Sequence, residues 1–378
     1  MNVREIKLFI KNILGKKTDR KLLAFYVDDW GSVRTKDKKA IDYLQAKGVK
    51  FIGHGSHFSR LDSLECNDDL TSLFEVLSSV KDKNGNGACF TAVMNPCNPN
   101  FEAIKANGFT EFISEPFTET LKKYGKGYEN VFDLWQEGIK KNLFYPMFHG
   151  TEHVSRKQWM RALTDDENPE QWAFECESVG VPDVEGYKSY SGTMQPYYIE
   201  TANDNIALAE NIKKGTSAIE NLFGFKTRQF KAGGDVVSPE LRPILKECGI
   251  EYLDEGLYIK KHIGDGKYVT SVNYFGKINK IGQKILVRNC MFEPCGEYST
   301  TLGNVDNCME EIDMAFRCGK PAVISSHRVN YVGSISPKNR ENGLSKLKSL
   351  LEEVVRKYPD VEFVNADQLG DIIFKKQN

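Results

Sequence analysis

The sequence predicts an α/β protein, a distorted (β/α) barrel of about seven to eight parallel strands with a long insertion. Short apolar runs alternate with amphipathic helical patterns through the whole chain of 378 residues, as expected for parallel strands joined by helical crossovers. Polar residues with catalytic or metal-binding chemistry follow several of these runs, as they do at the C-terminal rim of parallel barrels. Neither G-x-G-x-x-G nor a P-loop follows the first strand, which disfavours an open nucleotide-binding sheet.

The first element is an amphipathic helix within residues 1–20, which we separate from a single barrel domain over residues 21–378. Its apolar stripe consists of Ile6, Phe9, Ile10 and Ile13, and its lysines lie mostly elsewhere. The favoured interpretation is a helix that closes the bottom of the barrel, because most such stripes face a core. The alternative is a basic amphipathic helix in peripheral contact with the inner membrane surface.

The strands that follow are predicted from apolar and β-branched runs. They are Leu22 to Val27, Val49 to Gly53, Ala88 to Met94, Phe144 to Phe148, Arg228 to Lys231, Glu251 to Leu253, Lys284 to Phe292, Ala322 to Ser326 and Val361 to Val364. Between them, capping residues and apolar stripes predict helices. These are Asp37 to Gly48, Pro99 to Gly108, Asn203 to Gly224 and the leucine-rich stripe of residues 344–355.

Residues 164–200 form the least regular stretch, rich in Asp, Glu, Pro, Gly, Ser and Tyr. Long loops without secondary structure are uncommon unless functional, so we expect an ordered insertion beside the active site. Its tyrosines either stack on sugar rings or pack the loop against the domain, and packing is the commoner role. They are Tyr187, Tyr190, Tyr197 and Tyr198.

Composition excludes some functions. The 51 basic and 52 acidic residues nearly cancel and form no basic patch, so we expect no nucleic-acid partner. The nine cysteines include no C-x-x-C pair and are predicted to be free thiols of a reducing compartment. With no signal-like segment and no apolar run of about 20 residues, we expect a cytoplasmic protein, with a membrane-peripheral location as the alternative. No pattern predicts an oligomeric state.

Adjacent carboxylates and a pair of imidazoles suggest a catalytic centre. Asp28 and Asp29 end the first strand, and His149 and His153 follow a middle strand with a spacing of four residues. Two imidazole nitrogens and one carboxylate can hold a zinc-like ion while leaving a position open for water or substrate. The alternative for the aspartates is a helix N-cap. His327, after a late strand, is either a proton donor at the same rim or a core histidine bonded to backbone.

The order of these motifs resembles a known family. Val27-Asp28-Asp29, the H-x-x-x-H of His149 and His153, and Ser325-Ser326-His327 are similar to motifs of the NodB-homology polysaccharide deacetylases, carbohydrate esterase family four. The resemblance spans most of the chain, from Leu22 to Val364. Three segments more closely resemble deacetylase-like proteins of bacterial surface-polysaccharide loci. They are Phe148 to His153, Leu286 to Cys290 and Ser325 to Tyr331.

The resemblance implies a role for each residue. Asp29, His149 and His153 would bind a divalent metal, zinc by preference, with nickel, cobalt, iron or manganese as alternatives. Asp28 would be the base and His327 the acid. The expected reaction is removal of an N-acetyl group from an amino sugar or saccharide precursor, in surface-polysaccharide metabolism.

The chain departs from the family pattern at several positions. Lys231, in Phe230-Lys231-Ala232-Gly233-Gly234-Asp235, stands where the family has an arginine that orients the base, and a lysine does not reproduce the planar fork. Lys231 and Asp235 could instead belong to a βα turn. Trp30 follows the aspartates where glycine is common. The candidates for the carboxylate that supports His327 are Asp235, Asp254 and Glu293. Supporting or substrate-contacting roles are expected for Trp30, Lys231, Asp235, Arg288 and Glu293.

Three other functions stay open from sequence. A deformylase of a lipid-linked aminosugar would use the same chemistry. A glycosidase would use paired carboxylates, with Asp235 and Glu293 as the pair. A non-catalytic saccharide-binding protein could retain the barrel.

Overall fold

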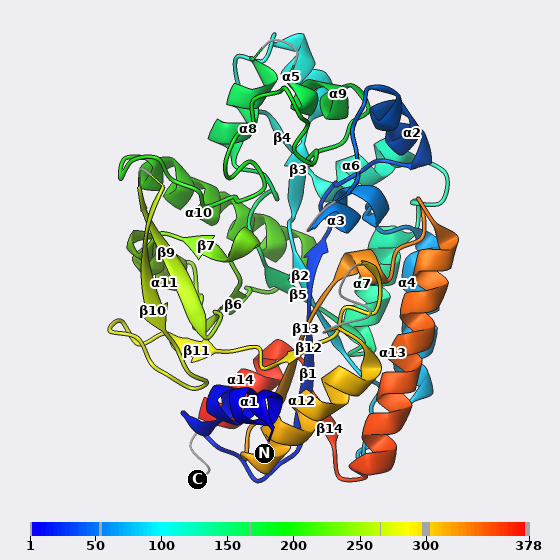
Figure 1. Ribbon diagram of the computed structural model, residues 1–378, viewed down its shortest axis with the longest axis vertical. Helices are drawn as coiled ribbons and strands as arrows, with labels where there is room; N and C mark the ends of the chain where they lie inside the picture. Colours follow the sequence, from blue (N-terminus) through cyan, green and yellow to red (C-terminus); the bar gives the residue numbers. More distant parts are fainter. Residues whose placement is uncertain (1, 53–54, 166–167, 265, 297–302, 375–378) are drawn as a thin grey trace.

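The structure is a computed structural model that describes residues 2–52, 55–165, 168–264, 266–296 and 303–374 (Figure 1). Its main sheet contains nine strands that pair only in parallel. They are β1 (Leu22–Trp30), β2 (Phe90–Met94), β5 (Phe144–Phe148), β6 (Gln229–Phe230), β8 (Tyr252–Asp254), β11 (Lys284–Leu286), β12 (Cys290–Met291), β13 (Ala322–His327) and β14 (Glu362–Phe363). Eight lie in the order β11-β8-β6-β5-β2-β1-β13-β12, and β14 pairs with β1. The sheet curls into a half-barrel surrounded by helices, which confirms the predicted fold class.

Helices lie around this sheet (Figure 1). They are α1 (Val3–Ile13), α2 (Lys38–Ala46), α3 (Ser56–Leu61), α4 (Asn67–Ser79), α5 (Phe101–Ala106), α6 (Phe117–Tyr124), α7 (Val131–Lys140), α8 (Arg156–Leu163), α9 (Pro169–Glu175), α10 (Asp204–Phe223), α11 (Arg242–Glu247), α12 (Val305–Arg317), α13 (Pro337–Lys357) and α14 (Ala366–Phe374). Short 3-10 turns occur at Gly233–Asp235, Pro239–Leu241 and Arg328–Asn330. Among the described residues, none of the helices has both the length and the apolar character that a membrane crossing requires.

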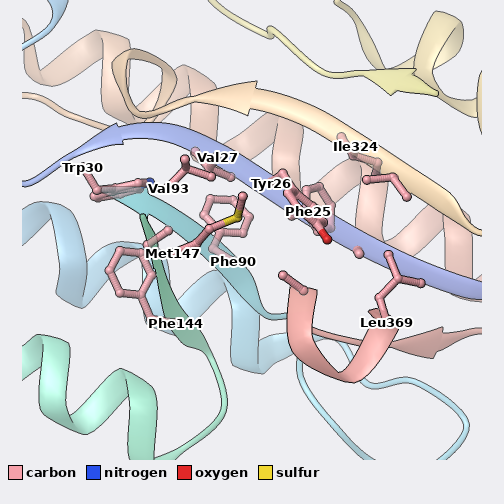
Figure 2. Close-up of a cluster of buried hydrophobic side chains, with 14 of the residues drawn as sticks. Phe25, Tyr26, Val27, Trp30, Phe90, Val93, Phe144, Met147, Ile324 and Leu369 are labelled. Carbon is pink, nitrogen blue, oxygen red and sulfur yellow. The ribbon is translucent and has the colours of Figure 1, made fainter. Parts of the chain in front are cut away.

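The core is built around β1, an interior strand of the sheet. Every residue from Leu22 to Val27 is at most 1% exposed, because the strand has partners on both edges and packed layers on both faces. Figure 2 shows Phe25 and Phe90 in this core, with their ring centroids 5.3 Å apart. Burial on both faces explains why β1 is a continuous apolar run with no alternation of polar residues.

Two smaller sheets extend the half-barrel. A three-stranded sheet combines β7 (Val236–Val237), β9 (Tyr258–Gly264) and β10 (Lys267–Val272), and a hairpin pairs β3 (Cys97–Pro99) with β4 (Ser114–Pro116). The β9–β10 hairpin was not predicted, because its lysines and exposed tyrosines give no clear apolar pattern.

Two strand predictions are wrong. Val49–Ile52 form a loop, whose Val49 and Phe51 pack beneath α2, and Gly53 lies outside the described residues. The single strand predicted over Lys284 to Phe292 is two strands, since β11 pairs with β8 and β12 pairs with β13. These two strands lie at opposite ends of the sheet order, so the chain itself crosses the open side of the half-barrel between them.

The expectation that the apolar stripe of α1 faces a core is also wrong. The helix lies near the N-terminal end of β1, but Ile6, Ile10 and Ile13 are 45%, 58% and 47% exposed (Figure 1). All nine cysteines are free thiols, as predicted.

Candidate metal centre

The two aspartates at the end of β1 reach one cleft because the strand is irregular there. Side chains of successive strand residues normally point to opposite faces. The register between β1 and β2 shifts between Val27 and Trp30, and Asp29 has φ 81°, in the left-handed region that residues other than glycine rarely adopt. Asp28 and Asp29 consequently line the same cleft.

Asp29 and the two histidines of the H-x-x-x-H motif come together. The Asp29 Oδ1 atom lies 3.0 Å from His153 Nε2 and 3.5 Å from His149 Nε2. One ligand atom from each of the three residues lies within 4.8 Å of the others. His149 directly follows β5, which reaches β1 through β2, so strand order brings these residues together across about 120 residues of sequence.

The donor set fits a divalent cation. His149 Nδ1 lies 2.9 Å from the Lys231 carbonyl oxygen, a contact that orients the ring and directs Nε2 toward Asp29. Burial raises the pKa of Asp29, but the two imidazoles outweigh burial and hold that pKa well below its usual range. Two imidazole nitrogens and an ionised carboxylate are a common ligand set for catalytic zinc and related ions.

Arg288 holds Asp28 with both arms of its guanidinium group. Nη1 donates to Asp28 Oδ2 at 2.9 Å, Nη2 donates to Oδ1 at 2.6 Å, and Nε donates to Asp254 Oδ2 at 2.7 Å. Burial raises the pKa of Asp28, but Arg288, His149 and His327 lower it below the usual value. Asp28 is therefore ionised and fixed in orientation, as a general base must be.

This arrangement corrects the expectation for Lys231. The residue that orients Asp28 is Arg288, from the segment that crosses the open side of the half-barrel, and not Lys231 at the end of β6. Lys231 is buried and its ammonium group pairs with Asp235. Because β6 and β11 both pair with β8, side chains that follow either strand can approach the same end of the sheet. A guanidinium group does bind both oxygens of Asp28, but it comes from the segment between β11 and β12.

His327 lies on the other side of Asp28 and is supported by Glu293. Strand pairing places His327 beside Asp28, and its Nε2 lies 3.8 Å from Asp28 Oδ2. Its Nδ1 lies 2.6 Å from Glu293 Oε1. Burial lowers the pKa of His327, but Glu293, Asp29 and Asp28 together outweigh burial and the pKa rises to about 10. A proton is thus held on the imidazole at neutral pH.

Glu293 is the supporting carboxylate among the three candidates from sequence. Its second oxygen accepts a hydrogen bond from Asn330 Nδ2 at 2.6 Å, so both oxygens have partners. Asp254 instead supports Arg288, and Asp235 pairs with Lys231. Glu293 and Asp235 therefore do not form the pair of available carboxylates that a glycosidase needs.

Trp30 has no contact with the cleft. It is fully buried, and its ring lies edge-on to Phe144 with centroids 4.8 Å apart. The tryptophan follows the aspartates in sequence, but the irregular end of β1 turns it into the core shown in Figure 2.

The cleft has a volume of about 270 Å³. Its lining includes residues that sequence reasoning missed, namely Arg34, Phe58, Met194 and Gln195. Met194 and Gln195 belong to the segment of residues 164–200, so part of that segment lines the cleft. Tyr197 of the same insertion is 1% exposed and packs against Phe230, which favours the packing role. Arg34 carried only one signal, its position six residues after Asp28.

The chain matches no protein-family model and no curated protein sequence. Similar solved structures include the "probable polysaccharide deacetylase" of Pseudomonas aeruginosa PAO1, with TM-score 0.48 and 11% identity over 95% of this chain and 93% of that one. Puue allantoinase has TM-score 0.45 and 12% identity over 93% and 89% of the two chains. The 4-alpha-glucanotransferase of Thermococcus litoralis has TM-score 0.45 and 11% identity over 95% of this chain, which spans 41% of the length of that enzyme. All three TM-scores are below 0.5, so the functional proposal depends on the geometry of the site.

Proposed function

We propose that this protein is a metal-dependent hydrolase that removes an N-acetyl group from an amino sugar of a saccharide. One observation carries the proposal. A two-histidine, one-aspartate ligand set lies in the same cleft as an oriented carboxylate and a protonated imidazole. These are the groups that metal-assisted amide hydrolysis requires, and they match the roles implied by the resemblance to the NodB-homology deacetylases.

Asp29, His149 and His153 would hold the metal, which we expect to be zinc or a similar divalent ion. When bound, such an ion would polarise the amide carbonyl and lower the pKa of water in the cleft. Asp28, held by Arg288, accepts a proton from the water that adds to the acetamide carbonyl carbon. His327 donates its proton to the sugar nitrogen as the carbon–nitrogen bond breaks. Water and amide are thereby converted to acetate and a free amino sugar.

Protonation states at the site support this division of roles. Asp28 has a lowered pKa and His327 a raised one, so at neutral pH the base is ionised and the acid is protonated. Environments that separate the pKa values of two neighbouring groups are how enzymes assign acid and base roles. Removal of a formyl group would use the same residues, and formate release is therefore the second activity to assay.

Metal content gives the first test. The purified chain should contain about one equivalent of zinc, nickel, cobalt, iron or manganese, and His149→Ala should lose it. The matched control is His262→Gln, which changes a buried histidine of the β9–β10 hairpin outside the cleft. A wild-type chain that binds none of these metals with measurable affinity contradicts the proposal.

Acetate release gives the second test. N-acetylglucosamine oligomers of increasing length serve as substrates for the metal-loaded protein. Acetate should appear with the wild-type chain and not with Asp28→Asn, whose metal content should be unchanged. A saccharide-binding protein without activity would bind the oligomers and release no acetate.

A further inference from the structure

Helix α1 is amphipathic, but it turns polar side chains toward the protein and apolar side chains toward solvent. Asn12 is 2% exposed and accepts a hydrogen bond from Asn289 Nδ2 at 2.8 Å, and Arg4 Nε lies 2.7 Å from Glu310 Oε2. The apolar residues point outward: Val3, Ile10 and Leu14 are 70%, 58% and 59% exposed. Surface helices of globular proteins normally bury their apolar face, so this helix is arranged for an apolar environment outside the chain.

A second segment continues the apolar face. The Lys16 backbone N–H donates to the Phe275 carbonyl oxygen at 3.0 Å, which places the segment of residues 272–278 against the end of α1. Its Tyr274 and Ile278 are 37% and 55% exposed. We define the basal apolar surface as Val3, Ile6, Phe9, Ile10, Ile13, Leu14, Tyr274 and Ile278.

The two segments that carry this surface contain more basic than acidic residues, although the whole chain is nearly neutral. Residues 1–20 contain six basic and two acidic residues, while the formal net charge of the protein is −1. Lys7, Lys16 and Lys17 are exposed on and beside α1, and Lys280 is exposed after the second segment. Residues 272–280 contain no acidic residue.

We propose that the basal apolar surface docks the protein on a bilayer that contains anionic phospholipids. A solvent-facing apolar stripe flanked by lysines is the pattern by which amphipathic helices lie in the membrane interface, with apolar side chains among the acyl chains and lysines at the headgroups. The basic surroundings favour anionic lipid over a second copy of the chain, because two copies would bring their lysines together.

The docking surface and the cleft lie at opposite ends of the sheet. Lys320 Nζ, just before β13, donates to the Gly15 carbonyl oxygen at 2.7 Å, which fixes the end of α1 near the N-terminal ends of β13 and β1. The cleft is at the C-terminal ends of the same strands, and β1 alone spans roughly 30 Å. Docking therefore leaves the cleft accessible, and changes in α1 should leave hydrolysis of soluble saccharides unaffected.

Vesicle co-sedimentation of the full-length protein tests the proposal. The probes are vesicles of phosphatidylcholine alone and of phosphatidylcholine mixed with phosphatidylglycerol. We expect binding to the mixed vesicles, weakened by added salt, and at least about a tenfold loss of binding in the double variant Phe9→Ser/Ile10→Ser. The matched control is Ile206→Ser, which changes an isoleucine on α10 that is 71% exposed. Lys16→Glu/Lys17→Glu should weaken binding without removing apolar area.

The outcomes are distinct from those for the proposed hydrolase. Metal content and thermal melting of the α1 variants should match those of the wild type, which shows that the site and fold are intact. Failure of the wild-type chain to bind the mixed vesicles overturns the docking proposal, as does unchanged binding of the Phe9→Ser/Ile10→Ser variant. A wild-type dimer that becomes a monomer in that variant, without vesicle binding, also overturns it and assigns the surface to self-association.

Discussion

Two arginines with little exposed surface, Arg288 and Arg328, each bind both oxygens of an aspartate, but only the aspartate that Arg288 binds lines the cleft. In the Arg288 cluster (Asp28, Asp254 and Arg288), the guanidinium lies between two aspartates, and Asp28 also lines the cleft. In the Arg328 cluster (Asp62, Glu65 and Arg328), Arg328 Nε and Nη2 donate to Asp62 at 3.0 and 2.9 Å, and Nη1 donates to Glu65 Oε2 at 2.9 Å.

The comparison shows that access and neighbouring charge, more than the pairing itself, decide what such a cluster can do. Burial raises the pKa of both Asp62 and Glu65, against the opposing effect of Arg328. Asp28 is also buried, but Arg288, His149 and His327 together bring its pKa below the usual value. The Arg328 cluster holds the loop after β1, since Arg328 Nη1 donates to Ser32 O at 2.8 Å and Glu65 accepts from the Gly31 N–H. The Arg288 cluster holds Asp28, the proposed base.

The largest expected effect comes from Asp28→Asn. Removing a general base should lower the rate of acetate release by about 10²–10⁴-fold while metal content and the free energy of unfolding change little. Asp62→Asn, the equivalent change in the other cluster, should instead reduce stability. If Asp28→Asn retains full activity, the assignment of the base is wrong.

Arg328→Met should show the converse behaviour. Its two buried carboxylates would lose the guanidinium that balances their charge, which costs about 3–5 kcal/mol of unfolding free energy. Urea denaturation of the metal-loaded protein measures this loss. If the variant unfolds at the same urea concentration as the wild type, the Arg328 cluster does not stabilise the fold as we expect.

Arg288→Lys should separate orientation from charge. The ammonium group keeps the positive charge between Asp28 and Asp254 but cannot bond both Asp28 oxygens with a planar fork. We expect a fall in kcat of about 10–100-fold with unchanged metal content. Equal kcat in both proteins would show that the charge alone is sufficient.

The smallest effect at mildly acidic pH is expected for Glu293→Gln. Glu293, with Asp29 and Asp28, raises the pKa of His327 to about 10 against the effect of burial, so the wild type should keep its acid protonated until the pH approaches that value. Without Glu293, burial lowers the pKa of His327, and the alkaline limb of kcat/KM should move to lower pH. Activity should be similar to wild type near pH 6 and reduced most at pH 8–9. An unmoved alkaline limb would contradict a positioning role for Glu293.

Local sequence patterns were enough to predict the features that depend on residues adjacent in the chain. The predicted bounds of Phe144 to Phe148 match β5, and the ends of β1, β5 and β13 place Asp29, His149 and His327 at one rim. The expected metal ligands come together because parallel strands share a C-terminal edge. The sequence predicted supporting or substrate-contacting roles for Arg288 and Glu293 but did not identify their partners, and it predicted no role for Arg34. Each of these contacts joins segments far apart in sequence.

Local sequence patterns are enough to predict the alternation of strands and helices and the apolar stripe of α1. They also predict the rim positions of Asp28, Asp29, His149, His153 and His327. Tertiary structure alone decided which arginine holds Asp28, which carboxylate supports His327, and which way the stripe of α1 faces. Periodicity and spacing show which residues share one face or one end of a helix or strand. Which side chains pair with each other depends instead on the order of the strands in the sheet. Arg288 reaches Asp28 across 260 residues only because the segment between β11 and β12 crosses the open side of the half-barrel.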